Sequence, residues 1–143
     1  MIELTISSGI FFTDCGNDEF QHFQIGHCNM DRSQCYIGVN ETFKFKYEVI
    51  GNQNSEKIMA DLTIVEKKIH KHRLNLCKEF PEMVTCPVVK DHHYERNFDI
   101  DFIGNFDRDD HSLILPIKIH IDIFGEHGQL ACAILNLNIT KSE

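Results

Sequence analysis

Six cysteines are the side chains of this sequence with the most distinctive chemistry, because a cysteine sulfur either binds a metal or forms a disulfide. A structural zinc site needs two close pairs, usually with about two to four residues between their members. The nearest pairs here are Cys28 with Cys35 and Cys77 with Cys86, and neither has that spacing. The even number, with Cys15 and Cys132 left near the two ends, favours two local loop staples and one long clamp. Spacing alone leaves other pairings open, as it does a set of six reduced, buried thiols.

Other residues with catalytic or metal-binding chemistry form no recognisable constellation. His70 and His72 share a strand face as a metal pair would, but no third ligand is identifiable, and the pair His92 and His93 is a weaker signal still. Asp99 and Asp101 alternate with apolar residues, which indicates a solvated face rather than an acid/base pair. The sequence has no nucleophile elbow and no glycine-rich phosphate loop, and cysteines in disulfides cannot act as nucleophiles. We therefore expect no catalysis, no cofactor and no metal.

The charge balance excludes nucleic acid as a partner. The formal net charge is −8 over 143 residues, and the acidic residues are spread along the chain, whereas phosphate binding requires a basic surface. The one basic concentration is the stretch 67–73, with Lys67, Lys68, Lys71 and Arg73. These four side chains are candidates for contact with lipid headgroups or an anionic membrane. A solvated strand end is the simpler interpretation.

Length and composition predict one secreted domain covering residues 1–143. A hydrophobic content of 42% with 11 phenylalanines is enough for a sizeable core. No apolar run reaches the roughly 18 to 20 residues of a membrane helix, and the start at Met1 lacks the basic residues of a signal peptide. We expect a mature form from which the signal peptide has been removed. Asn40 and Asn138 begin glycosylation acceptor sequences and are candidate glycosylation sites.

Apolar residues recur with a period of two, which predicts an all-β protein. The strongest pattern covers residues 113–124, where Ile117, Ile119 and Ile121 share one face and Lys118 and His120 share the other. Pro116 in this strand predicts a sheet edge or a bulge. Further strands are expected at 10–13, 20–26, 43–49, 58–65, 94–102 and 131–139. About seven antiparallel strands fit an immunoglobulin-like β-sandwich of two sheets, although an up-and-down barrel satisfies the same pattern.

Several short motifs surround the cysteines in a fixed order. They are Asp14-Cys15-Gly16, Gly26-His27-Cys28, Cys35-Tyr36-Ile37, Cys86-Pro87-Val88-Val89-Lys90 with Tyr94 following, and Gly125 through Ala133. Taken together, these motifs resemble the ML (MD-2-related lipid-recognition) family, and within it the Niemann-Pick type C2-like proteins and the mite group 2 allergens. The resemblance covers residues 15 to about 140 and includes the order of all six cysteines.

The resemblance implies an immunoglobulin-like sandwich whose sheets are splayed around an apolar cavity that holds one lipid. It also implies three disulfides, Cys15 to Cys132, Cys28 to Cys35 and Cys77 to Cys86. The last of these closes a longer loop than the family pattern, which predicts a reshaped cavity mouth.

The candidate cavity lining comes from the apolar faces of the expected strands. These residues are Phe43, Phe45, Tyr47, Val49, Leu62, Ile64, Tyr94, Phe98, Ile100, Phe102, Ile117, Ile119, Ile121, Ile123, Leu135 and Leu137. Each of them would otherwise simply fill a solid core. Tyr47 and Tyr94 offer hydroxyls to a polar ligand head, although a backbone carbonyl is the commoner partner of a buried phenol.

The expected function is a monomeric, non-enzymatic carrier of a sterol, fatty acid or similar hydrophobic molecule, in a secreted or endolysosomal setting. One alternative is a glycolipid recognition protein that acts with a receptor in innate immunity, and another is a semiochemical carrier. Transient membrane contact fits each of these. Full protonation of the nine histidines would change the formal charge from −8 to +1, which suggests the hypothesis of acid-tuned lipid transfer.

Overall fold

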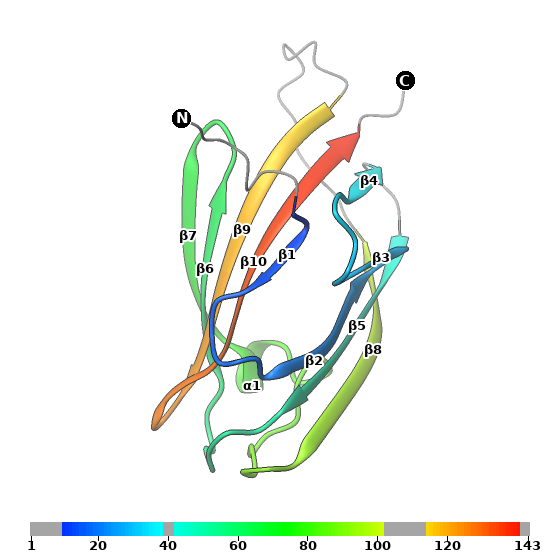
Figure 1. Cartoon of the computed structure of the whole chain (residues 1–143). Coiled ribbons are helices and arrows are strands. Elements are labelled where there is room, and N and C mark those ends of the chain that lie inside the picture. The colour runs from blue at the N-terminus through cyan, green and yellow to red at the C-terminus, as the bar shows by residue number, and fades with distance from the viewer. Residues whose placement is uncertain (1–9, 39–41, 102–113, 141–143) are drawn as a thin grey trace.

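The alternation of apolar and polar side chains produces two β-sheets that face one another (Figure 1). The computed structural model describes residues 10–38, 42–101 and 114–140. Within them the chain forms β1 (Phe12–Asp14), β2 (Phe20–Ile25), β3 (Cys28–Asn29), β4 (Tyr36–Gly38), β5 (Thr42–Ile50), β6 (Met59–Val65), β7 (Ile69–Asn75), α1 (Leu76–Glu79), β8 (His93–Asp101), β9 (Ile114–Gly125) and β10 (Gly128–Thr140).

The strands divide into a six-stranded and a four-stranded sheet. The first has the order β1-β10-β9-β6-β7, with β4 also beside β10, and the second has the order β3-β2-β5-β8. Every pairing is antiparallel except that of β4 with β10. Two separate sheets exclude the barrel and confirm the immunoglobulin-like sandwich. No helix in the described ranges is long and apolar enough to cross a membrane.

The hairpin of β9 and β10 forms the centre of the larger sheet. Leu115 and Ile117 are buried while Lys118 and His120 are exposed, so the predicted alternation is confirmed. Pro116 pairs with Asn138 of β10, whereas the pairing of β9 with β6 ends at Lys118. The proline therefore lies at a local edge, where its missing N–H costs no hydrogen bond.

Aromatic rings from both sheets pack against one another in the space between the sheets. Phe23 of β2 is 1% exposed, and its ring lies 4.9 Å from that of Phe12, 5.0 Å from Phe45 and 5.6 Å from Phe20, measured between centroids. Leu135 of the opposite sheet is also fully buried in this cluster. Edge-to-face and tilted ring contacts of this kind stabilise a core beyond simple burial.

The three disulfides confirm the pairing that the family resemblance implies. Cys15–Cys132 ties the chain after β1 to β10, and Cys28–Cys35 links β3 to the residue before β4. Cys77–Cys86 closes the segment between β7 and β8, in which α1 lies. No described cysteine is left as a free thiol.

The sequence pattern missed the short and the exposed elements. In β7 every residue from Ile69 to Arg73 is exposed, so it carries no apolar stripe, and its strand form comes from pairing with β6. The single turn of α1 is too short for helical periodicity and begins at a capping Asn75, whose side chain accepts a hydrogen bond from the backbone N–H of Lys78. Such elements depend on their neighbours rather than on local pattern.

We expect the long disulfide to contribute more stability than the short one. Cys15 and Cys132 are 117 residues apart in the sequence, and Cys28 and Cys35 only 7. In the chain-entropy model, alanine at both ends of the long bond lowers the free energy of unfolding by about 5 kcal/mol, and at both ends of the short bond by about 2.5 kcal/mol. Urea unfolding of the two double variants checks this order. Equal losses would show that local strain or packing, not loop closure, sets the contribution.

Candidate functional site

An apolar cavity of about 270 Å³ lies between the two sheets. The smaller sheet supplies mostly aromatic wall, the larger sheet supplies aliphatic wall, and the rest comes from the segment after β7 and from Gly51 and Ile58, which lie between β5 and β6. The lining residues are Phe20, Phe23, Phe45, Tyr47, Val49, Ile50, Gly51, Ile58, Ala60, Leu62, Leu74, Leu76, Met83, Val84, Thr85, Val88, Tyr94, Phe98, Ile121, Ile123, Leu130 and Ala131.

The inner residues of β5 and β8 show that the space is hollow. Phe45, Tyr47 and Phe98 point into the sandwich, and yet each is only half-buried. The rings of Phe45 and Phe98 stack with 5.1 Å between centroids, which fixes this part of the wall. Inward side chains stay partly exposed because they face a cavity instead of the opposite sheet.

The predicted lining residues divide between the cavity and the solid core. Those on the cavity wall are Phe45, Tyr47, Val49, Leu62, Tyr94, Phe98, Ile121 and Ile123. Ile117, Leu135 and Leu137 are instead buried in the core cluster, and Ile64 and Ile119 pack against that cluster. Phe102 and the side chains of Phe43 and Ile100 lie outside the described part of the chain. Alternation assigns a residue to a face of the sheet but not to a position along the strand, and the hollow occupies only part of each strand.

The segment between β7 and β8 supplies wall residues that the sequence interpretation missed. Leu76, Met83, Val84, Thr85 and Val88 all line the cavity, although most of them lie on irregular backbone with no periodic pattern. The signal that pointed to this region was the long Cys77–Cys86 loop. The loop is a wall of the cavity and not merely a surface connection.

The phenol of Tyr47 forms a hydrogen bond with the segment between β7 and β8. Its hydroxyl donates to the backbone carbonyl of Met83. Burial raises the pKa of Tyr47 to about 12, against a smaller opposite effect of the nearby Arg96 charge. The hydroxyl of Tyr94 accepts a hydrogen bond from the backbone N–H of Val89 at 2.8 Å. Both tyrosines proposed as ligand contacts therefore bond to the protein backbone.

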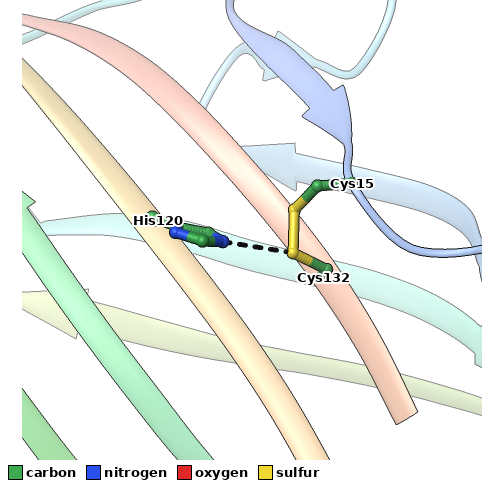
Figure 2. Close-up of side chains that lie close together, drawn as sticks. All are labelled: Cys15, His120 and Cys132. Atoms are coloured by element: carbon green, nitrogen blue, oxygen red, sulfur yellow. Dashed lines mark hydrogen bonds between the residues drawn. A yellow bond between two sulfur atoms is a disulfide. The ribbon is translucent and has the colours of Figure 1, made fainter. Parts of the chain in front are cut away.

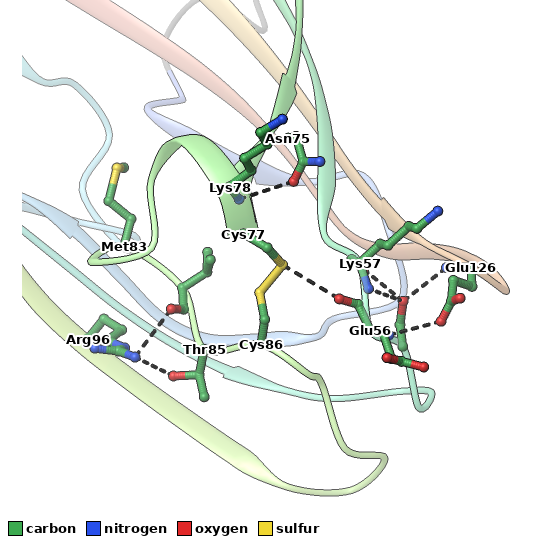
Figure 3. The surroundings of a disulfide bond; sticks show 12 residues. Glu56, Lys57, Asn75, Cys77, Lys78, Met83, Thr85, Cys86, Arg96 and Glu126 are labelled. Carbon is green, nitrogen blue, oxygen red and sulfur yellow. Dashed lines mark hydrogen bonds between the residues drawn. A yellow bond between two sulfur atoms is a disulfide. The ribbon is translucent and has the colours of Figure 1, made fainter.

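Arg96 of β8 also holds this segment (Figure 3). Its Nη2 group donates to the side-chain oxygen of Thr85, and to the carbonyl of Val84 at 3.3 Å. Tyr47 and Arg96 are directly opposite one another in the pairing of β5 with β8. Two neighbouring side chains of one sheet thus fix residues 83–85 against the cavity.

None of the four basic side chains of the stretch 67–73 lines the cavity. Lys67 and Lys68 are in the turn between β6 and β7, and Lys71 is exposed on β7. Arg73 forms a two-pronged ion pair with Asp61, at 2.7 and 2.8 Å, and this contact lowers the pKa of the Asp61 carboxyl. The cavity residues of this hairpin are Ala60, Leu62 and Leu74. Arg73 lies next to them along the strands, since it pairs with Asp61, but alternation places its exposed side chain on the opposite face from Leu74. The turn with Lys67 and Lys68 is at the end of the hairpin that is far from α1 (Figure 1). A headgroup role for these cations remains a prediction.

One group in the described part of the chain has the compactness of a metal site, and its sulfurs form a disulfide. The ligand atoms of Cys15, His120 and Cys132 lie within 4.8 Å of one another (Figure 2). His120 Nε2 is 3.3 Å from Cys132 Sγ. Because the two sulfurs are bonded to each other, neither is a thiolate, which is the form that binds metal.

The histidine pairs of the sequence pack with other groups. His70 lies 3.4 Å from a carboxylate oxygen of Glu66, and His93 lies 3.0 Å from one of Glu48. The ring of His92 contacts that of Tyr94 with 4.7 Å between centroids. The described surroundings of these histidines are those of ordinary surface residues.

The two glycosylation candidates differ in what the structure says of them. Asn138 is half-buried in β10 between β4 and β9, and its amide donates to the carbonyl of Cys35 at 3.4 Å. Asn40 lies outside the described residues. Modification of either residue remains a prediction.

Comparison with known proteins finds relatives over almost the whole chain. A mite group 2 allergen of Glycyphagus domesticus is 27% identical over 126 residues, which are 85% of this chain and 90% of that protein. One of Tyrophagus putrescentiae is 24% identical over an alignment of 145 positions, which covers 97% of this chain and 93% of that protein. No family model matches the chain.

Two solved structures share the fold. A Niemann-Pick type C2 protein from Japanese carpenter ant superposes with a TM-score of 0.66 at 20% identity, covering 90% of this chain and 98% of that one. Chicken MD-1, crystallised in complex with lipid IVa, superposes with a TM-score of 0.61 at 18% identity, covering 87% of this chain and 85% of that one.

We expect the buried phenol of Tyr47 to make the protein less stable at alkaline pH. Its folded pKa of about 12 exceeds the ordinary value of 10.0, so the unfolded chain loses the proton first as the pH rises. The stabilisation is complete below pH 10 and is lost toward pH 12. Between pH 9.5 and 11.5, the free energy of unfolding of the wild type should fall by about 2 kcal/mol more than that of Tyr47→Phe.

Urea unfolding at the two pH values measures this difference. Tyr36→Phe is the matched control, because Tyr36 is 43% exposed and bonds only to the Gln34 side chain among the described residues. The control should fall as steeply as the wild type. An equally steep fall in Tyr47→Phe would contradict the assignment.

Proposed function

We propose that this chain, which its mite relatives and its fold assign to the ML (MD-2-related lipid-recognition) family, is a non-enzymatic carrier of a hydrophobic molecule. The ligand class is a sterol, fatty acid or similar lipid, bound in the cavity between the sheets. The observation that supports this most is the apolar cavity itself, whose walls come from both sheets and from the segment after β7.

The energetics of the cavity favour occupancy. Truncation series give about 24 cal/mol per Å³ of enclosed empty cavity, so a hollow of about 270 Å³ that is partly open to solvent costs at most about 6.5 kcal/mol. The net stability of a whole domain is about 5 to 15 kcal/mol. A hydrocarbon ligand that covers several hundred Å² of apolar surface regains on the order of 10 kcal/mol before ordering and association costs. An apolar ligand therefore stabilises the fold that binds it.

The disulfides support both the carrier role and an oxidising location. Cys77–Cys86 restrains the segment that forms one wall, and Cys15–Cys132 restrains the larger sheet. Cross-links let a hollow protein persist while it is empty, which a carrier must do between loading and release. Disulfides persist in secreted and luminal proteins, which fits a secreted or endolysosomal site. Acid-tuned release through the histidines belongs to the same hypothesis.

A second candidate is a lipid recognition protein that acts with a receptor. The observation that favours it is the shared fold with chicken MD-1, whose structure was determined with lipid IVa. A carrier and a recognition protein differ in their partners, because only the second forms a stable complex with a receptor. Recovery of the secreted protein in such a complex would favour recognition over transport.

The experiment that tests lipid binding compares two tryptophan variants at adjacent positions of β6. Leu62 lines the cavity, whereas Thr63 points to the opposite face of the strand. Leu62→Trp should fill the hollow, weaken binding of a neutral lipid dye at least about tenfold and raise the melting temperature of the empty protein. Thr63→Trp should leave dye binding unchanged.

Native mass spectrometry of the same proteins reports the bound molecule directly. The wild type, purified without delipidation, should carry a lipid adduct that Leu62→Trp lacks. A wild type that carries no adduct and binds no lipid dye would rule out the carrier. Equal binding by the wild type and Leu62→Trp would move the binding site out of this cavity.

A further inference from the structure

Arg96 is a half-buried cation on the inner face of β8, beside the apolar cavity but not itself one of its lining residues. Along β8 it lies between Tyr94 and Phe98, and both of those residues line the cavity. Alternation places the three side chains on the same face of the strand. Both groups that accept its hydrogen bonds, the carbonyl of Val84 and the side chain of Thr85, belong to lining residues. The guanidinium is therefore within hydrogen-bond reach of the cavity wall.

Arg96 has no acidic partner among the described residues. The ion pairs there join Arg73 to Asp61, His70 to Glu66 and His93 to Glu48. Arg96 is half-buried, and a partly buried charge is costly unless it is paired. Its neighbour Tyr47 is no counter-ion, because burial raises the pKa of that phenol to about 12 and keeps it neutral.

The geometry leaves donors for a ligand. Both contacts of Arg96 to described residues are made by Nη2. The Nε and Nη1 groups carry the other three N–H donors of the guanidinium, and arginine binds carboxylate and phosphate oxygens well. The phenol oxygens of Tyr47 and Tyr94 already bond to backbone groups. A ligand with one charged end would therefore find its strongest partner at Arg96.

We propose that Arg96 binds the anionic head of a single-chain amphiphile, a long-chain carboxylate, whose hydrocarbon fills the cavity. This inference rests on the proposed carrier function and narrows its ligand class. The volume of about 270 Å³ lies just below the roughly 300–1,000 Å³ of pockets for drug-sized ligands, which suits one chain. A carboxylate is the smallest head that uses the free donors, and a phosphate shares the same chemistry.

Displacement of a neutral lipid dye tests the proposal with three competitors of equal chain length: a carboxylic acid, the primary alcohol and the alkyl phosphate. The wild type should bind the acid at least about tenfold more tightly than the alcohol, which is the contribution of a charge-assisted hydrogen bond. Arg96→Gln should abolish this preference, measured as the ratio of the acid affinity to the alcohol affinity of the same variant. Glutamine is two atoms shorter than arginine and does not reach Thr85 and Val84 as Nη2 does, but a shift of this segment would weaken both competitors alike and leave the ratio unchanged.

Arg73→Gln is the matched control, because it removes an exposed arginine that is already paired with Asp61. It should keep the full preference for the acid. A second measurement needs no variant: the wild-type preference should disappear as the carboxyl of the ligand is protonated below roughly pH 4 to 5, while binding of the alcohol stays constant.

The outcomes separate the two proposals. If the wild type binds acid and alcohol equally well, the carrier stands and the role of Arg96 is wrong. A tighter phosphate than carboxylate would overturn the choice of head. If Arg96→Gln weakens the acid and the alcohol by the same factor, so that the preference persists, Arg96 only holds the segment in place. If none of the three competitors displaces the dye from the wild type, both the carrier function and the role of Arg96 are wrong.

Discussion

The structure depends on keeping an apolar space open between two sheets that would otherwise pack together. Hydrophobic burial draws the inner faces toward each other, since each buried methylene contributes about 0.8 kcal/mol. In one half of the sandwich this attraction is satisfied by the core cluster that includes Phe11 and Leu135, neither of which lines the cavity. In the other half the inward side chains of β5 and β8 meet a cavity. The packed half sets the distance between the sheets, and the same distance leaves a cavity in the other half, where the facing side chains do not meet.

The segment between β7 and β8 covers part of the cavity without filling it. A third layer of secondary structure would fill the space, whereas a mobile loop would expose it to water. Here an irregular segment is tied at the Cys77–Cys86 disulfide and by the side chains of Tyr47 and Arg96. The polar contacts are made to the backbone carbonyls of Met83 and Val84 and to the side chain of Thr85. The side chains of Met83 and Val84 line the cavity. The wall is therefore held by polar bonds but presents hydrocarbon to a ligand.

The relatives of this chain share its fold at low sequence identity. Identity to the mite allergens is low, 27% and 24%, although the matches run over most of the chain. The fold that the chain shares with the ant and chicken structures depends on which positions face inward and on the disulfides, and many apolar residues satisfy those demands. Ligand preference can change within such a fold through a few wall residues, and Arg96 is the charged residue of this wall region that carries our proposal.

The sequence by itself determined the class of fold and its covalent frame. A period of two specifies strands and their inward faces, and the ordered cysteines with their neighbouring motifs specify the family and hence the three bonds. It did not specify β7 or α1, because an exposed edge strand and a single helical turn carry no apolar period.

Only the tertiary structure decided which inward residues line the cavity. Phe45 and Leu135 have the same pattern in the sequence, and yet one borders the hollow and the other lies in the solid core. Arg96 is a similar case, because a charged residue on the inner face of β8 interrupts the alternation of apolar residues. Only the tertiary structure shows that its side chain bonds to Thr85 and Val84 in the segment between β7 and β8. Alternation records the side of a sheet, which is a local property of the backbone. The depth of a residue depends on what the opposite sheet and the crossing segment place against it, and contacts between distant parts of the chain decide that.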